Sequence, residues 1–326
     1  MGGLTEPRST LLPSVTAGTV AGIRTLIGAT ALAALIFSGE LAGGLAAGLG
    51  ALLFSGAILG VVVALTSSYP GTVAQPQDGA AAILAIMGAA LVAAMPGEPA
   101  DRILTTVLVG IAATSILTGL VLVGLGGLRL GSLVRFIPYP VIGGFLAGSG
   151  WLFVRGSVPV MTGQSLDVEH MAALAAPAVA MRWLPGLAFA VALLAALRRG
   201  GHAFLVPGML LGATVLFYAV LLALGHTVAD ARAAGWLLGP FPEGGAWQPD
   251  VLLRVTDADW RALAAEIPKM ATVALVSVVA LLLNSTGLEL ATRRDIDPNR
   301  ELAAAGVANL ASGLGGGIVG FHALSV

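Results

Sequence analysis

Long apolar runs separated by short polar connections dominate the chain. Several of these runs exceed the roughly 20 residues that an α-helix needs to cross a bilayer. The pattern predicts nine membrane spans, at residues 12–37, 41–65, 76–94, 103–125, 137–154, 184–197, 204–224, 267–290 and 302–314, and a last apolar segment that opens near Gly320. We therefore expect an all-α membrane protein.

The composition agrees with a chain whose solvent is lipid. Hydrophobic residues make up 57% of the 326 residues and charged residues only 10%, against roughly a quarter charged in soluble domains. The 45 glycines allow helix backbones to approach closely where lipid gives no hydrophobic drive for association. A net charge of -1 without a basic block argues against a nucleic-acid partner, and the absence of cysteine excludes disulfides and thiolate metal sites.

Arginines mark one side of the predicted bundle, since short cytoplasmic loops are enriched in lysine and arginine. Three short loops share a side if the first span runs outward; their arginines are Arg129, Arg135, Arg198, Arg199, Arg293, Arg294 and Arg300. The pattern predicts a protein of the bacterial inner membrane with residues 1–11 in the cytoplasm. The long connections 155–183 and 225–266 then lie on the opposite side.

Two apolar segments are interrupted by helix breakers. Residues 67–82 read SSYPGTVAQPQDGAAA, and residues 312–326 read SGLGGGIVGFHALSV. A pair of interrupted segments in corresponding halves is typical of transporter sites built from broken helices at an inverted repeat. Because the two breaks are seven spans apart, the halves have opposite orientation, and we expect two half-helices whose amino ends face each other. The chain ends inside the tenth segment, so we expect a longer protein with about four further spans.

Gln75, Gln77 and Asp78 flank Pro76 where the first interrupted segment becomes helix. Proline and aspartate at a helix start are also ordinary capping chemistry, so a purely local role is one interpretation. The other is a binding site, because free backbone donors and the helix dipole attract an anion. We expect the two glutamines to contact substrate and Asp78, which repels an anion when ionised, to hold a coupling cation or proton.

His322 and Ser325 lie at the corresponding place in the second half. The histidine is either a hydrogen-bonded core residue or a titratable group near the substrate. In the eighth span, Asn284, Ser285 and Glu289 are further candidates for binding a coupling ion or proton, and Ser285 and Glu289 share a helix face. An interfacial pair between Glu289 and the arginine four residues later is the alternative.

Arg24 stands about twelve residues into the first span, roughly 18 Å deep at about 1.5 Å per residue. A charge at that depth costs at least about 2.5 to 3.5 kcal/mol. Two interpretations remain open: a charge partner for Asp78 or Glu289, or a residue that attracts an anion.

Three stretches carry a family resemblance. They are DPNRELAAAGVANLASGLGGG at 297–317, RFIPYPVIGGFLAGS at 135–149, and LIFSGELAGGLAAGLGALLFSGAILG with the proline-broken SSYPGTVAQPQ that follows it. Together they resemble the sulfate permease (SulP) family of inorganic anion transporters. The resemblance implies a seven-plus-seven inverted repeat, here truncated in the tenth span. It also implies a core domain formed by residues 12–126 and 267–326, a gate domain at 127–224, an extracytoplasmic loop at 225–266, and homodimers.

The chain departs from the family pattern at two places. Ala29 and Thr30 stand where members carry a Pro-Gln pair, so that Thr30 takes the place of a substrate-binding glutamine. Asn284 and Ser285 stand where members have an acidic residue, and Glu289 follows one turn later.

The resemblance implies secondary transport of a small inorganic anion of the sulfate or bicarbonate class, coupled to Na+ or H+, by elevator-like motion. A nucleobase permease of the same architecture and an anion channel are the alternatives. No catalytic triad spacing, phosphate-binding loop, metal-ligand cluster or dinucleotide fingerprint supports an enzyme or a bound cofactor. The expected partners are the anion, membrane lipid and a second copy of the chain.

Overall fold

The computed structural model describes residues 11–69, 71–132, 139–164, 166–167, 169–200, 205–237 and 249–322. The chain divides into two compact units, Met1–Leu152 with Pro242–Val326, and Phe153–Phe241. The helices that lie in the first unit are α1 (Leu11–Ile36), η1 (Gly39–Gly44), α2 (Leu45–Thr66), α3 (Asp78–Ala94), α4 (Ala100–Gly127), η3 (Pro249–Asp257), α10 (Trp260–Ala265), α11 (Ile267–Thr292) and α12 (Pro298–Leu314).

The second unit is smaller and also helical. Helix α5 (Tyr139–Thr162) crosses the division between the units, and α6 (Met171–Leu174), α7 (Pro177–Arg199), α8 (Leu205–Ala223) and α9 (Val228–Ala233) follow it. Helices α7 and α8 pack against each other. Every described side chain of α7 is at least partly exposed, as suits a helix that contacts lipid or another subunit.

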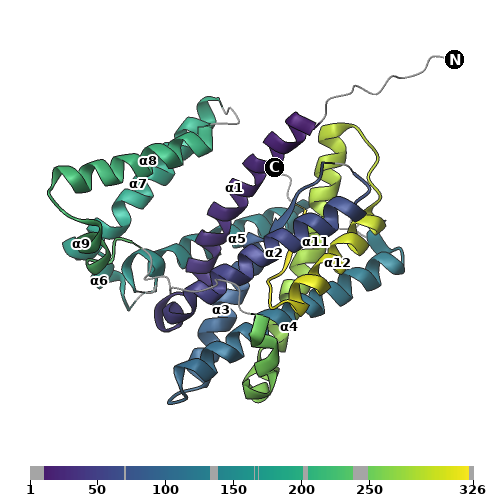
Figure 1. Ribbon diagram of the computed structural model, residues 1–326, viewed down its shortest axis with the longest axis horizontal. Coiled ribbons are helices and arrows are strands. Elements are labelled where there is room, and N and C mark those ends of the chain that lie inside the picture. The colour runs from purple at the N-terminus through teal and green to yellow at the C-terminus, as the bar shows by residue number, and fades with distance from the viewer. Residues whose placement is uncertain are drawn as a thin grey trace. The chain divides into compact units, whose positions relative to one another are not determined.

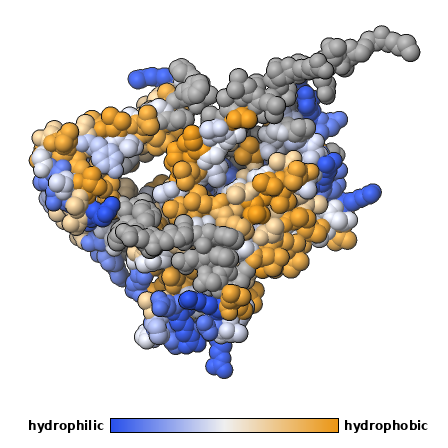
Figure 2. Space-filling view, viewed as in Figure 1, coloured by the Kyte–Doolittle hydropathy of each residue, from blue (hydrophilic) through white to orange (hydrophobic). Residues whose placement is uncertain are grey.

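All nine predicted spans contain a helix in the described residues, which agrees with the predicted all-α class. Four helical segments there are long and apolar enough to cross a membrane, namely Gly39–Thr66, Ala100–Gly127, Pro177–Arg199 and Ile267–Glu289. Hydrophobic residues cover much of the coloured surface in Figure 2. The predicted start of the third span at Pro76 was wrong. Pro76 lies in a strand, and the helix begins at Asp78 because Gln77 still has extended backbone angles.

The connection at 225–266 contains structure that the hydropathy pattern did not predict. Helix α9 begins with a capping box in which Thr227 and Asp230 bond each other's backbone N–H groups. The hydrogen bond from the Thr227 backbone lowers the pKa of the Asp230 carboxyl. Asp259 caps α10 by accepting from the N–H groups of Arg261 and Ala262, and the Ala262 bond lowers the pKa of its carboxyl.

Two interrupted segments cross in the first unit. Strand β1 (Ala74–Pro76), which follows α2, pairs antiparallel with β2 (Gly320–His322), which follows α12. The register sets Ala74 opposite His322, Gln75 opposite Phe321 and Pro76 opposite Gly320. Helices α3 and α12 have 17 residues each, about 26 Å at 1.5 Å per residue, which is short of a hydrocarbon core of about 30 Å.

Helix α12 packs along α4, and the two run side by side in Figure 1. Glycines make this contact, with Gly119 on α4 facing Gly306 on α12. A Cβ atom on Gly306 would lie 2.6 Å from the Val123 backbone nitrogen and 2.9 Å from the Gly119 carbonyl oxygen. At Gly119 it would lie 2.8 Å from the Leu310 nitrogen. The absence of side chains therefore lets the two backbones touch, as the glycine content predicted.

We expect Gly306→Ala to destabilise the protein by about 1–3 kcal/mol, because the added methyl group meets backbone atoms that cannot rotate away. The measurement is the thermal unfolding temperature in detergent. Gly124→Ala on α4 is the matched control, since a Cβ there meets nothing within 4 Å and alanine favours helix. Equal unfolding temperatures for the two variants would contradict the close contact.

Candidate functional site

The two strands lie where the chain leaves α2 and where it reverses after α12. Gly316 has a φ of +79°, a left-handed angle that suits glycine, and it starts the reversal. From there the chain runs back along α12, so that Ile318 reaches Ser312, Gly320 reaches Asn309 and His322 reaches Glu301. These helix residues, Glu301, Asn309 and Ser312, lie on one face of α12 at spacings of eight and three residues.

Side chains of α12 and α2 form hydrogen bonds with the backbone of residues 318–320. Asn309 bonds both polar groups of Gly320: its Oδ1 accepts from the Gly320 N–H at 2.9 Å and its Nδ2 donates to the Gly320 carbonyl at 2.6 Å. Ser312 donates to the Ile318 carbonyl at 2.9 Å, and Ser55 accepts from the Ile318 N–H at 2.7 Å. An extended segment in an apolar interior needs such partners, because each unpaired backbone group there costs several kcal/mol.

Two predicted site residues hold the strands from the other side. The Gln77 N–H donates to the Val319 carbonyl at 3.3 Å, and its side-chain Nε2 donates to the carbonyls of Phe321 at 2.9 Å and Gln75 at 3.3 Å. Asn284 on α11 donates through Nδ2 to the His322 carbonyl at 2.8 Å. Both contacts of the Gln77 amide nitrogen are to carbonyl oxygens, which fixes its orientation. Although Gln77 is the residue before α3, its side chain makes no capping bond, so capping does not explain it.

Glu301 and His322 form a buried pair at the end of β2. Their side chains are 2% and 4% exposed, and His322 Nε2 lies 2.6 Å from Glu301 Oε2. That separation is short enough for an ion pair when the imidazole is protonated. Ser67 and Ser68, just after α2, also bond the carboxylate: the Ser68 N–H and hydroxyl each donate to Oε1 at 2.6 Å, and the Ser67 hydroxyl lies 2.9 Å from Oε2.

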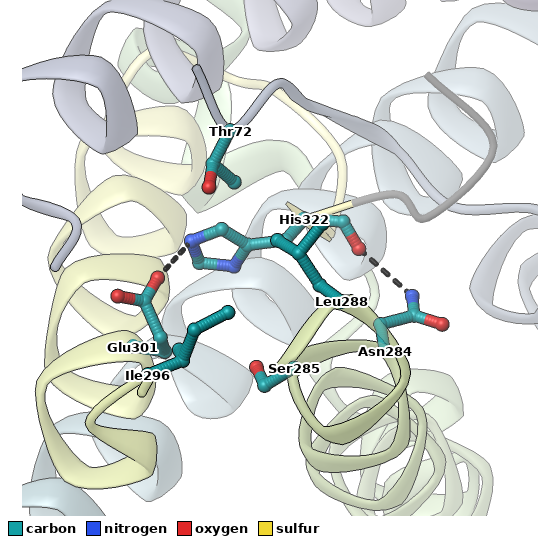
Figure 3. A pocket seen from close by; sticks show the side chains of 7 residues that line it. All are labelled: Thr72, Asn284, Ser285, Leu288, Ile296, Glu301 and His322. Atoms are coloured by element: carbon teal, nitrogen blue, oxygen red, sulfur yellow. Dashed lines mark hydrogen bonds and ion pairs between the residues drawn. The ribbon is translucent and has the colours of Figure 1, made fainter. Parts of the chain in front are cut away.

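A small cavity borders this pair (Figure 3). Its volume of about 10 Å³ is roughly the space for the centre of one water molecule. Thr72, Asn284, Ser285, Leu288, Ile296, Glu301 and His322 line it. The cavity therefore joins the end of β2 to α11 and to the start of α12.

The predicted site residues fall into two groups. Gln75, Gln77, Asn284, Ser285 and His322 gather around the two strands and the cavity beside them. The Ser285 hydroxyl donates to the Leu281 carbonyl of its own helix at 2.9 Å.

None of the remaining predicted residues is among the described residues that line the cavity. Asp78 is exposed at the first position of α3, and the Arg24 guanidinium on α1 attracts it. The Thr30 hydroxyl donates to the Leu26 carbonyl within α1 at 2.9 Å. Glu289 is half-buried and is not among the residues that line the cavity. Ser325 lies outside the described residues.

Sequence reasoning missed Glu301, Asn309 and Ser312 as site residues. All three lie inside the stretch 297–317 that carried the family resemblance, but we assigned them no role. The available signal was their spacing, which places three polar residues on one face of an apolar helix. The spacing predicts that this face of the helix has hydrogen-bond partners. It does not predict that the partners are backbone groups of a strand that follows the same helix.

We expect Gln77→Met to destabilise the protein by about 1–3 kcal/mol, because it removes the donor to the Phe321 carbonyl without changing the side chain's length. Thermal unfolding in detergent measures the effect. Gln75→Met is the control, since the Gln75 side chain makes no hydrogen bond to another described residue. If Gln77→Met unfolds at the same temperature as Gln75→Met, the amide is not what holds β2.

Comparisons with known proteins agree with this architecture. The sequence model of the sulfate permease family matches residues 12–326. The vacuolar basic amino acid transporter VSB1 of Saccharomyces cerevisiae is 26% identical over 268 residues, 77% of this chain and 25% of the yeast protein. The bicarbonate transporter BicA of Synechocystis sp. is 27% identical over 266 residues, 81% of this chain and 44% of BicA.

The chain therefore spans a quarter to less than half of the length of these curated relatives. Among solved structures, the transmembrane domain of a cyanobacterial bicarbonate transporter BicA matches with a TM-score of 0.66 at 23% identity, over 95% of this chain and 75% of that domain. That likeness shows the fold, with its inverted repeat. On the match across residues 12–326, the chain belongs to the sulfate permease family and is a multi-pass membrane protein.

Proposed function

We propose that this chain is the membrane part of a secondary transporter for a small inorganic anion of the sulfate or bicarbonate class. The observation that carries the proposal is the crossing of β1 and β2, which brings two interrupted segments from oppositely oriented halves together at the amino end of α3. The relative BicA transports bicarbonate, as its name states, and supports this choice of substrate class.

The amino end of α3 supplies the chemistry for an anion. The first backbone N–H groups of a helix have no partner within it, and the helix dipole adds partial positive charge there. The first N–H in α3 with an intrahelical partner is that of Ala81, which bonds the Gln77 carbonyl at 3.0 Å. The N–H groups of Asp78, Gly79 and Ala80 are therefore the donors that we assign to an oxyanion.

Gln77 takes a different role from the one its position suggested. Its amide N–H groups already hold Phe321 and Gln75, so they are not free to donate to a substrate. We propose that Gln77 holds the strand pair in place while the α3 backbone, with Gln75 beside it, contacts the anion.

Asp78 needs a neutralising partner in this scheme. Two like charges about 4 Å apart repel by roughly 4 kcal/mol at an effective dielectric constant of about 20, and Asp78 opens the helix that would bind the anion. Arg24 attracts Asp78 and supplies part of the compensation. We propose that a coupling cation or proton at Asp78 supplies the rest.

The mechanism that we propose is alternating access by an elevator-like movement of residues 12–126 and 267–326 against residues 127–224, in a homodimer of the bacterial inner membrane with a cytoplasmic N-terminus. Residues 12–126 and 267–326 belong to one compact unit, which also includes residues 127–152, and this supports movement of the two segments together. The arginines of the short loops support this orientation.

A second candidate is transport of a basic amino acid. The yeast relative is named for that substrate class, and an exposed carboxylate at the start of α3 would attract a cationic side chain. A nucleobase substrate and a channel mechanism remain as further outcomes of the test.

The test is uptake of labelled sulfate, bicarbonate, arginine and uracil into proteoliposomes that contain the full-length protein. We expect saturable uptake of sulfate or bicarbonate and none of the other two. Saturable arginine or uracil uptake without anion uptake would replace the proposal with the corresponding alternative. Anion flux that rises linearly with concentration, without saturation, would show a channel.

Asp78→Asn should abolish the dependence of uptake on a sodium or proton gradient while anion binding survives, because the amide cannot hold the ion. If pairing with Arg24 is instead its role, Asp78→Asn and Arg24→Gln should each lower the unfolding temperature, and the double variant should recover part of it. Asp101→Asn, in the first turn of α4, is the control. Gradient dependence equal to wild type in folded Asp78→Asn protein would refute the coupling role.

A further inference from the structure

The buried pair of Glu301 and His322 lies outside the proposed anion and coupling residues, yet β2 connects it directly to them. We propose that this pair is a proton-binding site linked to the anion site, at which His322 takes up a proton when the anion binds. The proposal has two parts, a proton site and its link to an anion site, and the second part rests on the proposed function. The proton site itself can be tested without any anion.

The surroundings of Glu301 suit an ionised carboxylate. The Ser68 N–H, the Ser68 hydroxyl and the Ser67 hydroxyl all donate to it. These groups compensate for lost water, and they carry no positive charge. Among the described residues, the nearest group that can supply a positive charge is the His322 imidazole, 2.6 Å away.

The charge of the pair then depends on one proton. With a neutral imidazole, the pair carries a net negative charge in a buried site. With a protonated imidazole, the pair is an ion pair of zero net charge. A negative charge beside an anion site opposes anion binding, so the protonated pair favours the anion and the anion favours the protonated pair. Reciprocity of the two effects follows from linkage.

The pair lies close enough to the anion site for this link. His322 is opposite Ala74 in the strand register, four residues before the start of α3. Phe321, the neighbour of His322, accepts a hydrogen bond from Gln77. The pair and the amino end of α3 therefore share one short stretch of paired backbone, with little polar solvent to screen one from the other.

Other ionisable groups do not take over this role. The cavity wall is formed by the α2–β1 connection, α11, the residues before α12, α12 and β2, and its ionisable members are Glu301 and His322. Arg300 and Asp297, at the start of α12, are exposed; Arg300 Nε donates to the Thr66 carbonyl at 2.8 Å. Glu289, one turn beyond Ser285, is half-buried outside the wall.

The cavity leaves room for one water molecule beside the imidazole. His322 Nδ1 is buried and has no hydrogen-bond partner among the described residues. The ring borders the cavity, together with the polar side chains of Ser285 and Asn284 (Figure 3). The volume of about 10 Å³ is roughly what one water molecule needs, and a water there would bond Nδ1 and pass a proton to it.

The first experiment asks whether His322 binds a proton. Solid-state NMR of the full-length protein in liposomes, with 15N-labelled histidine, distinguishes imidazole from imidazolium between about pH 5 and pH 8. The signal that disappears in His322→Gln is assigned to this residue. We expect it to change from imidazolium to imidazole within that range. A signal that stays in one form throughout would overturn the proposal.

The second experiment measures the link, with sulfate as the probe because it remains a dianion over this pH range. Calorimetry in buffers of different ionisation enthalpy counts protons taken up per sulfate bound. For the wild type we expect proton uptake and an affinity that falls as the pH rises. His322→Gln should lose the proton uptake and bind sulfate about fivefold or more weakly at low pH.

Two variants separate charge from structure. His322→Lys keeps a positive charge beside Glu301 and removes the imidazole, so it should bind sulfate without proton uptake and with little pH dependence. Glu301→Gln removes the buried negative charge, so its affinity for sulfate should fall less than that of the wild type as the pH rises. His226→Gln, in an exposed position after α8, should match the wild type. If folded His322→Lys protein still takes up a proton with sulfate, the link is not at this pair.

The outcomes distinguish the two proposals. Absence of sulfate and bicarbonate binding at every pH would overturn the proposed function and the link, while the NMR titration would still decide the proton site. Sulfate binding without proton uptake in the wild type would leave the proposed function standing and overturn the link.

Discussion

The structure depends on supplying hydrogen-bond partners to an extended backbone segment inside an apolar interior. A strand inside a bilayer cannot form hydrogen bonds with water. Because, among the described residues, β1 and β2 pair only with each other, the outer edge of each strand needs other hydrogen-bond partners. Side chains from three helices bond the backbone of β2 and of the residues just before it: Asn309 of α12 at Gly320, Asn284 of α11 at His322, and Ser55 of α2 at Ile318. Because those side chains are placed on helices, the two strands pair at a fixed position. The amino end of α3 is positioned as a result.

Glycine makes the helix side of this arrangement possible. The contact of Gly306 with the backbone of α4 brings α12 closer than side chains would allow, and dispersion contacts between packed backbones replace the hydrophobic effect that lipid does not provide. The polar residues of α12 then face β2 and its surroundings, while its glycines face α4. One helix thus serves two different contacts, with glycines on one face and Glu301, Asn309 and Ser312 on another.

The helical class, the two interruptions and the approximate spans could be predicted from the sequence, because they follow from hydropathy and from helix breakers. Gln77 could be selected as a site candidate, but its bond to Phe321 depends on a partner more than two hundred residues away, which local patterns do not encode. Pro76 was misassigned to a helix because proline suits both a first helical turn and a strand. Glu301 was missed because a single acid near a helix start is usually a capping residue.

The reversal after α12 has a consequence for how this protein family can change over time. Between Gly316 and His322 the chain is paired with α12 at three positions: Ile318 with Ser312, Gly320 with Asn309, and His322 with Glu301. An inserted or deleted codon in this stretch shifts all three pairings together, and no single compensating substitution restores them. Length variation among homologues should therefore be rare between Gly316 and His322, and more frequent in connections whose residues are not paired one by one with a neighbouring helix.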